Sequence, residues 1–94
     1  MNKMKIYKYL LKQDPVASQT VEIPVDAKIL HVGEQHGELY VWAMVNTEST
    51  VVNYKFFVLG TGVPIDHLEI VSKFVGSVQM SSGLVWHIFY KVRQ

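Results

Sequence analysis

Short runs of β-branched and aromatic residues, separated by turn-forming residues, fill almost the whole chain. This pattern is typical of β-strands joined by tight reversals. It predicts a mainly β, antiparallel sheet of about six to seven strands, arranged as a small barrel or a sandwich. The predicted strands are Lys5–Leu11, Gln19–Ile23, Lys28–Val32, Glu38–Val45, Val51–Leu59, Lys73–Met80 and Leu84–Lys91.

The residues between these strands suit chain reversals. Pro24 restricts the backbone and removes a hydrogen-bond donor. The run from Gly33 to Gly37 is expected to be a hairpin loop whose residues include two glycines that can take positive φ. The run 64–71 fits two structures. A proline at its start and apolar residues three apart favour a short helix, whereas adjacent β-branched residues favour an ordered loop.

Two predicted strands carry apolar side chains on both faces. In Glu38–Val45, aliphatic side chains alternate with Tyr, Trp and Met, and in Leu84–Lys91, Trp86 and Ile88 alternate with His87 and Phe89. A strand with one solvated face alternates apolar with polar residues instead. Either the sheet curls into a small barrel with a covering segment, or a second copy covers one face. We expect the second arrangement, and therefore a homo-oligomer, either a dimer or a larger assembly.

Length and composition narrow the class of protein. The 94 residues predict a single domain over 1–94. A net charge of +1 gives no electrostatic reason to expect a nucleic acid polymer as partner. No apolar run reaches the roughly 20 residues of a membrane helix, so no membrane association is expected. The absence of cysteine removes disulfides and thiolate chemistry, and it fits a cytoplasmic location.

The residues that could carry chemistry do not match a known catalytic or metal motif. The spacing of the four histidines fits neither a zincin helix nor a zinc finger, so neither a metal nor a cofactor is expected. Ser81, Ser82 and Gly83 lack the strand-to-helix elbow of a hydrolase nucleophile. His87, in an apolar segment, fits either a core or interface histidine or a ligand-contacting imidazole. We therefore expect no enzyme.

Two further features have a structural and a ligand-binding interpretation. Gly60-Thr61-Gly62 follows an apolar strand and fits a simple turn or a backbone nest for an anion. Trp42 and Trp86 fit core packing or stacking on a planar ligand.

The order of the segments also carries a resemblance. The most specific pieces are the run Ala27–Val32, the Gly-Thr-Gly at 60–62 and Val85–His87, within a likeness that extends from about Met4 to Phe89. The chain resembles a family of small uncharacterised proteins of bacteriophages and prophages, a domain of unknown function. The resemblance implies a phage protein in the host bacterial cytoplasm and supplies no mechanism. Phages carry other compact, non-enzymatic proteins that assemble as oligomers and sequester nucleotide-derived signals of bacterial immunity, and by analogy alone we expect the same role here.

These interpretations predict a non-enzymatic binding protein that captures a small, nucleotide-derived anionic ligand at a site shared between subunits. The two tryptophans would stack on its planar group, the histidines would donate hydrogen bonds, and the Gly-Thr-Gly backbone with a lysine would meet phosphate. The alternative is a protein–protein interaction module that blocks or remodels a host or virion component. The predicted ligand-binding residues are Trp42, Trp86, His87, His31, Gly60, Thr61, Gly62 and Lys28.

Overall fold

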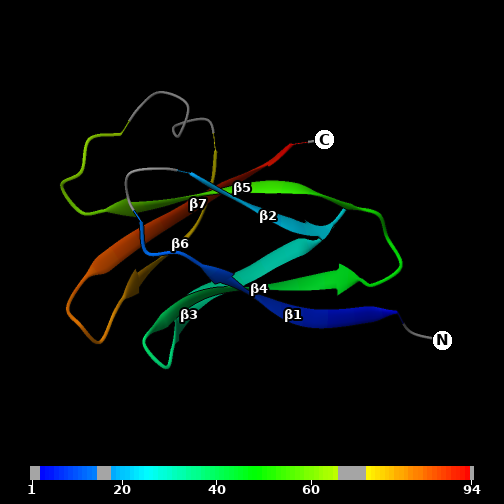
Figure 1. Cartoon of the computed structure of the whole chain (residues 1–94), viewed down its shortest axis with the longest axis horizontal. Helices are drawn as coiled ribbons and strands as arrows, with labels where there is room; N and C mark the ends of the chain where they lie inside the picture. The colour runs from blue at the N-terminus through cyan, green and yellow to red at the C-terminus, as the bar shows by residue number, and fades with distance from the viewer. Residues whose placement is uncertain (1–2, 15–17, 66–71, 94) are drawn as a thin grey trace.

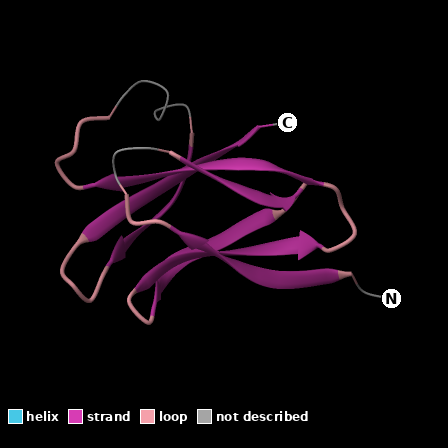
Figure 2. Ribbon diagram, in the orientation of Figure 1, coloured by secondary structure: helices cyan, strands magenta, loops and turns pink. Residues whose placement is uncertain are grey.

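Seven β-strands and their connections make up the described part of the computed structural model, residues 3–14, 18–65 and 72–93 (Figures 1 and 2). No helix occurs within these residues. The prediction of a mainly β chain is thus confirmed. The strands are β1 (Met4–Leu11), β2 (Gln19–Pro24), β3 (Lys28–Gln35), β4 (Glu38–Asn46), β5 (Val51–Gly60), β6 (Lys73–Gln79) and β7 (Val85–Arg93).

The strands form two antiparallel sheets that are not joined into a barrel. Sheet A has the order β1-β4-β3, and sheet B has the order β2-β5-β7-β6. Of the two predicted arrangements, the sandwich is therefore the correct one. The sheets contact each other at one side through β3 and β6.

The inner faces of the two sheets supply the core. In β4 every second side chain is aliphatic and fully buried: Leu39, Val41, Ala43 and Val45 are each 0% exposed. Side chains of β5 and β7 that also point inward, such as Phe56 and Ile88, pack in the same cluster. Because successive residues of a strand point to opposite faces, this burial fixes which residues face outward. Burying each large apolar side chain stabilises the fold by about 1.5–3 kcal/mol.

The turn between β3 and β4 is shorter than the predicted loop from Gly33 to Gly37, so the prediction of its length is wrong. β3 continues to Gln35, and the turn consists of His36 and Gly37, whose φ angles are 53° and 79°. Two positive φ values are those of a type I′ turn, whose twist matches the flanking strands. Gly33 lies inside β3 and takes no part in the turn.

One further expectation concerns the connection between β5 and β6. The prediction of either a helix or a loop at 64–71 concerns mainly residues 66–71, which lie outside the described residues. Residues 64 and 65 are described and are not helical.

The described residues contain no helix long and apolar enough to cross a membrane.

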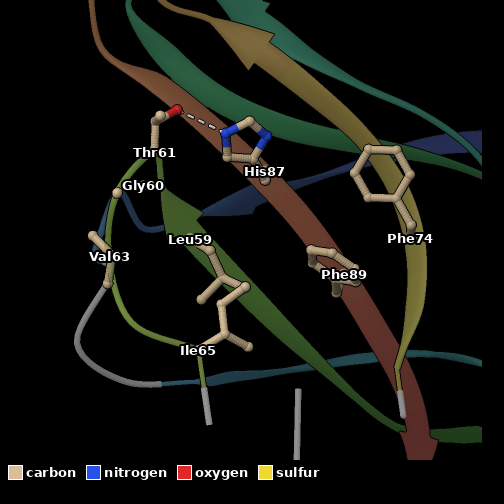
Figure 3. Close-up of a pocket in the computed structure, with 9 residues that line it drawn as sticks. Leu59, Gly60, Thr61, Val63, Ile65, Phe74, His87 and Phe89 are labelled. Carbon is tan, nitrogen blue, oxygen red and sulfur yellow. Dashed lines mark hydrogen bonds between the residues drawn. The ribbon is translucent and has the colours of Figure 1, made fainter. Parts of the chain in front are cut away.

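The outer faces of β4 and β7 are half-buried within one chain. On sheet A, the Lys8 ammonium lies over the Tyr40 ring and the His31 ring packs against Trp42. On sheet B, the segment that follows β5 lies beside His87 and Phe89, as a covering segment would (Figure 3). The expected second copy stays a prediction.

Candidate functional site

A tight turn directly after β5 forms the upper rim of the candidate site. The Val63 backbone N–H donates a hydrogen bond to the Gly60 carbonyl oxygen at 3.2 Å, and Gly62 has a φ of 86°. These features describe a type II turn, which requires positive φ at its third residue. The turn interpretation of Gly60-Thr61-Gly62 is confirmed, and its effect is to place Thr61 beside β7.

His87 is held between two hydroxyl groups. Thr61 Oγ1 lies 2.8 Å from His87 Nε2 (Figure 3). Ser77 Oγ lies 2.7 Å from His87 Nδ1. A neutral imidazole donates at one ring nitrogen and accepts at the other, and a hydroxyl can do either. Both ring nitrogens therefore have partners, and the ring is fixed on the outer face of sheet B.

Beside His87 lies a small pocket of about 270 Å³. Its walls are mainly apolar, and Phe74 and Phe89 contribute rings whose centroids are 5.1 Å apart. No charged side chain is among the described residues that line it. The lining residues are Leu59, Gly60, Thr61, Gly62, Val63, Ile65, Phe74, His87 and Phe89 (Figure 3).

A second hollow of about 450 Å³ includes Gly60, Thr61 and Val63 and also Trp86. Trp86 is only 6% exposed, and its indole N–H donates a hydrogen bond to Gln13 Oε1 at 3.2 Å. The core-packing interpretation of Trp86 is therefore the one that its position supports. Because Trp86 and His87 are neighbours in one strand, they point to opposite faces of sheet B.

The remaining predicted site residues lie on sheet A. Trp42 and His31 pack together on its outer face, with ring centroids 5.8 Å apart, and Lys28 is opposite Met44 in the register of β3 with β4. The structure thus brings Gly60, Thr61, Gly62 and His87 together and leaves Trp42, His31 and Lys28 elsewhere. Within one chain the predicted residues do not form one site; a site containing all of them would need a second copy.

Ser77 and the apolar walls are the site residues that the sequence prediction lacked. The sequence did contain a signal for Ser77, because counting back from the Ser81–Gly83 reversal pairs it with His87, as the register of β6 with β7 shows. The wall residues Ile65, Phe74 and Phe89 carried no comparable signal, since apolar residues in a small β-protein are usually core.

Charged and titratable groups elsewhere serve the fold. The Glu34 carboxylate accepts hydrogen bonds from the Ser81 N–H and hydroxyl, both at 2.6 Å, and these hold the pKa of Glu34 below its ordinary value. Burial raises the pKa of Tyr54 and of Tyr9. Among the described residues, no group of three or more His, Asp or Glu side chains could hold a metal ion.

Comparisons with known proteins give a family and no activity. A family model described as "Domain of unknown function (DUF7352)" matches residues 2–94. No curated protein and no solved structure matches the chain. The chemistry of the pocket therefore has to be inferred from its own residues.

Proposed function

This chain belongs to the DUF7352 family of domains of unknown function, and we propose that it is a non-enzymatic binding protein that holds a small ligand in the pocket beside His87. The observation that carries the proposal is the hydroxyl–imidazole–hydroxyl chain at the edge of an apolar pocket. Such a pocket combines apolar walls with a few fixed polar groups, which is the usual composition of a ligand site.

The walls favour a flat, largely apolar group with one or two hydrogen-bonding atoms. Phe74 is 58% exposed beside the pocket and offers a ring face to such a group. Thr61 has a rotatable hydroxyl that can donate or accept. Since no charged residue is among the described lining, a nucleotide-derived ligand would seat its base here and leave its phosphates in solvent.

We further propose the biological setting that the sequence resemblance implies. The protein would act in the cytoplasm of a bacterial host during phage infection. There it would sequester a nucleotide-derived immune signal. Its effect would depend on affinity and on the amount of protein, because a sequestering protein holds one ligand per site.

Binding without turnover is favoured by the partners of His87. A serine or threonine nucleophile acts with a base that a third group orients, commonly a carboxylate, and with donors for the oxyanion. Here the partners of the two imidazole nitrogens are the hydroxyls of Thr61 and Ser77, so neither nitrogen meets a carboxylate. Ligand recovered after long incubation should have an unchanged mass.

A thermal-shift screen tests the proposal. The panel would contain cyclic di- and trinucleotides and ADP-ribose derivatives, with AMP, NAD and the uncharged nucleosides as comparison ligands. A ligand at about 100 times its Kd stabilises the folded state by roughly 2.7 kcal/mol. For a domain of this size that corresponds to a rise in Tm of more than about 10 °C.

Matched variants locate the binding site. Thr61→Val should reduce the ligand-induced shift, whereas Thr50→Val, at an exposed threonine outside the pocket, should not. Lys28→Met should also leave the shift unchanged if one chain holds the ligand alone. A reduced shift in Lys28→Met would instead indicate a site shared between subunits. If no ligand raises Tm, the proposal fails.

A protein–protein interaction module is the second candidate. Exposed apolar side chains on sheet A, including Ile6, Leu10 and Leu30, favour it. In that case the partner would be a host or virion component, and no small ligand would change Tm.

A further inference from the structure

The four sheet edges of the sandwich differ in how well they resist pairing with another strand. β3 and β6 each contain a register irregularity, between Ile29 and His31 and between Phe74 and Gly76. β2 is shorter and ends at Pro24, which has no N–H. Bulges, prolines and short strands are the devices by which natural proteins block edge pairing.

β1 carries none of these devices. Its eight residues pair with β4 in one continuous register, and among the described residues β4 is its only strand partner. β1 carries two lysines: Lys5 is exposed on the inner face, and Lys8 is turned away from the edge. The Lys8 ammonium lies 4.5 Å from the Tyr40 ring centroid and donates to Gln35 Oε1 on the far side of sheet A.

Apart from Lys5 and Lys8, β1 consists of apolar and aromatic residues, and some of these are exposed on each face of the sheet. Ile6 and Leu10, on the outer face, are 61% and 53% exposed, and Tyr7, on the inner face, is 43% exposed. An additional strand beside β1 would contact all three. A regular, exposed and apolar edge strand is the kind that accepts another strand.

We propose that this strand is β1 of a second copy, paired antiparallel about a two-fold axis at Tyr7. In a symmetric pair, opposite residues lie on the same face, so their numbers must differ by an even amount. The register centred on Tyr7 places Ile6 opposite Lys8 of the partner subunit and Lys5 opposite Tyr9 of the partner subunit. No two lysines face each other.

The neighbouring registers are poorer. Moving the axis to Lys8 sets Lys8 opposite Lys8 of the partner subunit, and like charges directly across a strand pair destabilise it. Moving it to Ile6 shortens the paired segment, because β1 begins at Met4. The Tyr7 register joins two three-stranded sheets into one continuous sheet across the dimer.

A cysteine at the axis tests this geometry, because the chain has no cysteine of its own. Opposite residues of antiparallel strands have Cα atoms roughly 4.5–5.5 Å apart, within the range of a disulfide. Under mild oxidation, Tyr7→Cys should form a covalent dimer of twice the 10.8 kDa chain mass. Thr20→Cys, on the exposed edge strand β2, is the control and should cross-link far more slowly.

Light scattering after size exclusion gives an independent readout. The unmodified chain should be a dimer at low micromolar concentration, and Tyr7→Lys should be a folded monomer because it sets two lysines at the axis. Circular dichroism checks that each variant is folded. A monomeric unmodified chain would overturn the proposal. So would a dimer that persists in Tyr7→Lys, or cross-linking of Tyr7→Cys that is no faster than that of Thr20→Cys.

Discussion

The hydroxyl of Thr61 lies 2.8 Å from Nε2 of His87, and this contact joins the turn after β5 to the outer face of β7. Ser77 occupies the other ring nitrogen from β6. One imidazole thus links β6, β7 and the turn after β5. The link fixes the edge of the pocket before any ligand arrives, which lowers the cost of ordering it on binding.

Removing either hydroxyl should weaken the fold slightly. Ser77→Ala and Thr61→Val should each lower the free energy of unfolding by about 0.5–1.5 kcal/mol, the net value of one hydrogen bond. Because both act on the same ring, the double variant should deviate from the sum of the single effects. Urea unfolding measures all three. Effects that add within error would show that His87 does not couple the two hydroxyls.

Glu34 should stabilise the protein in a pH-dependent way. Its pKa lies below the ordinary value of 4.5 because Ser81 donates two hydrogen bonds to the carboxylate. A carboxyl group whose pKa is lowered by folding adds stability above its unfolded pKa and loses it as pH falls through the folded value. Glu34→Gln should therefore lower Tm at pH 7, and the difference from the unmodified chain should shrink below about pH 4.5.

Glu38→Gln, at an exposed position on the neighbouring strand, is the control for this comparison. It should change Tm little at either pH. A Glu34→Gln deficit that stays constant down to pH 3 would show that the effect comes from lost packing and not from the charge.

The strands could be predicted because their signals are local. The alternating apolar sets predicted the strand β4 but not which of its two faces is buried; the structure buries Leu39, Val41, Ala43 and Val45, each 0% exposed. The turn at His36 and Gly37 was placed wrongly because a non-glycine residue takes positive φ there. Histidine is enriched among the non-glycine residues that take positive φ, but such residues are uncommon, so the two glycines were the stronger candidates.

The candidate site was only half predictable for a different reason. His87 and Thr61 stood out as chemically capable residues, but which side chains surround them depends on how the strands pair. Trp86 was a candidate ligand-binding residue because its planar ring can stack on a planar ligand, whereas strand geometry points it into the core. Trp42 and Lys28 belong to the other sheet, a division that no local pattern reveals.

The loss of stability on substituting Gly37 should depend only on how readily the new residue adopts the positive φ of this position. A Cβ added there meets no atom within 4 Å, and the φ of this residue is 79°. Gly37→Ala should therefore cost about 1–2 kcal/mol from the left-handed conformation, with no steric contribution. Gly37→Asn should cost less, because asparagine adopts this conformation more readily. Equal costs for the two variants, measured by urea unfolding, would contradict this explanation.

The two tryptophans should report separate environments. In Trp42→Phe the remaining indole is Trp86, which is 6% exposed and hydrogen-bonded to Gln13, so acrylamide should quench it weakly. In Trp86→Phe the remaining indole is Trp42, half-buried on the outer face of sheet A, and quenching should be stronger.

The two tryptophans should also differ in how much they stabilise the fold. Trp86→Ala should lower the free energy of unfolding by about 3–5 kcal/mol, because it removes a buried side chain, and Trp42→Ala should lower it clearly less. Similar quenching and similar costs at both positions would place Trp86 outside the core.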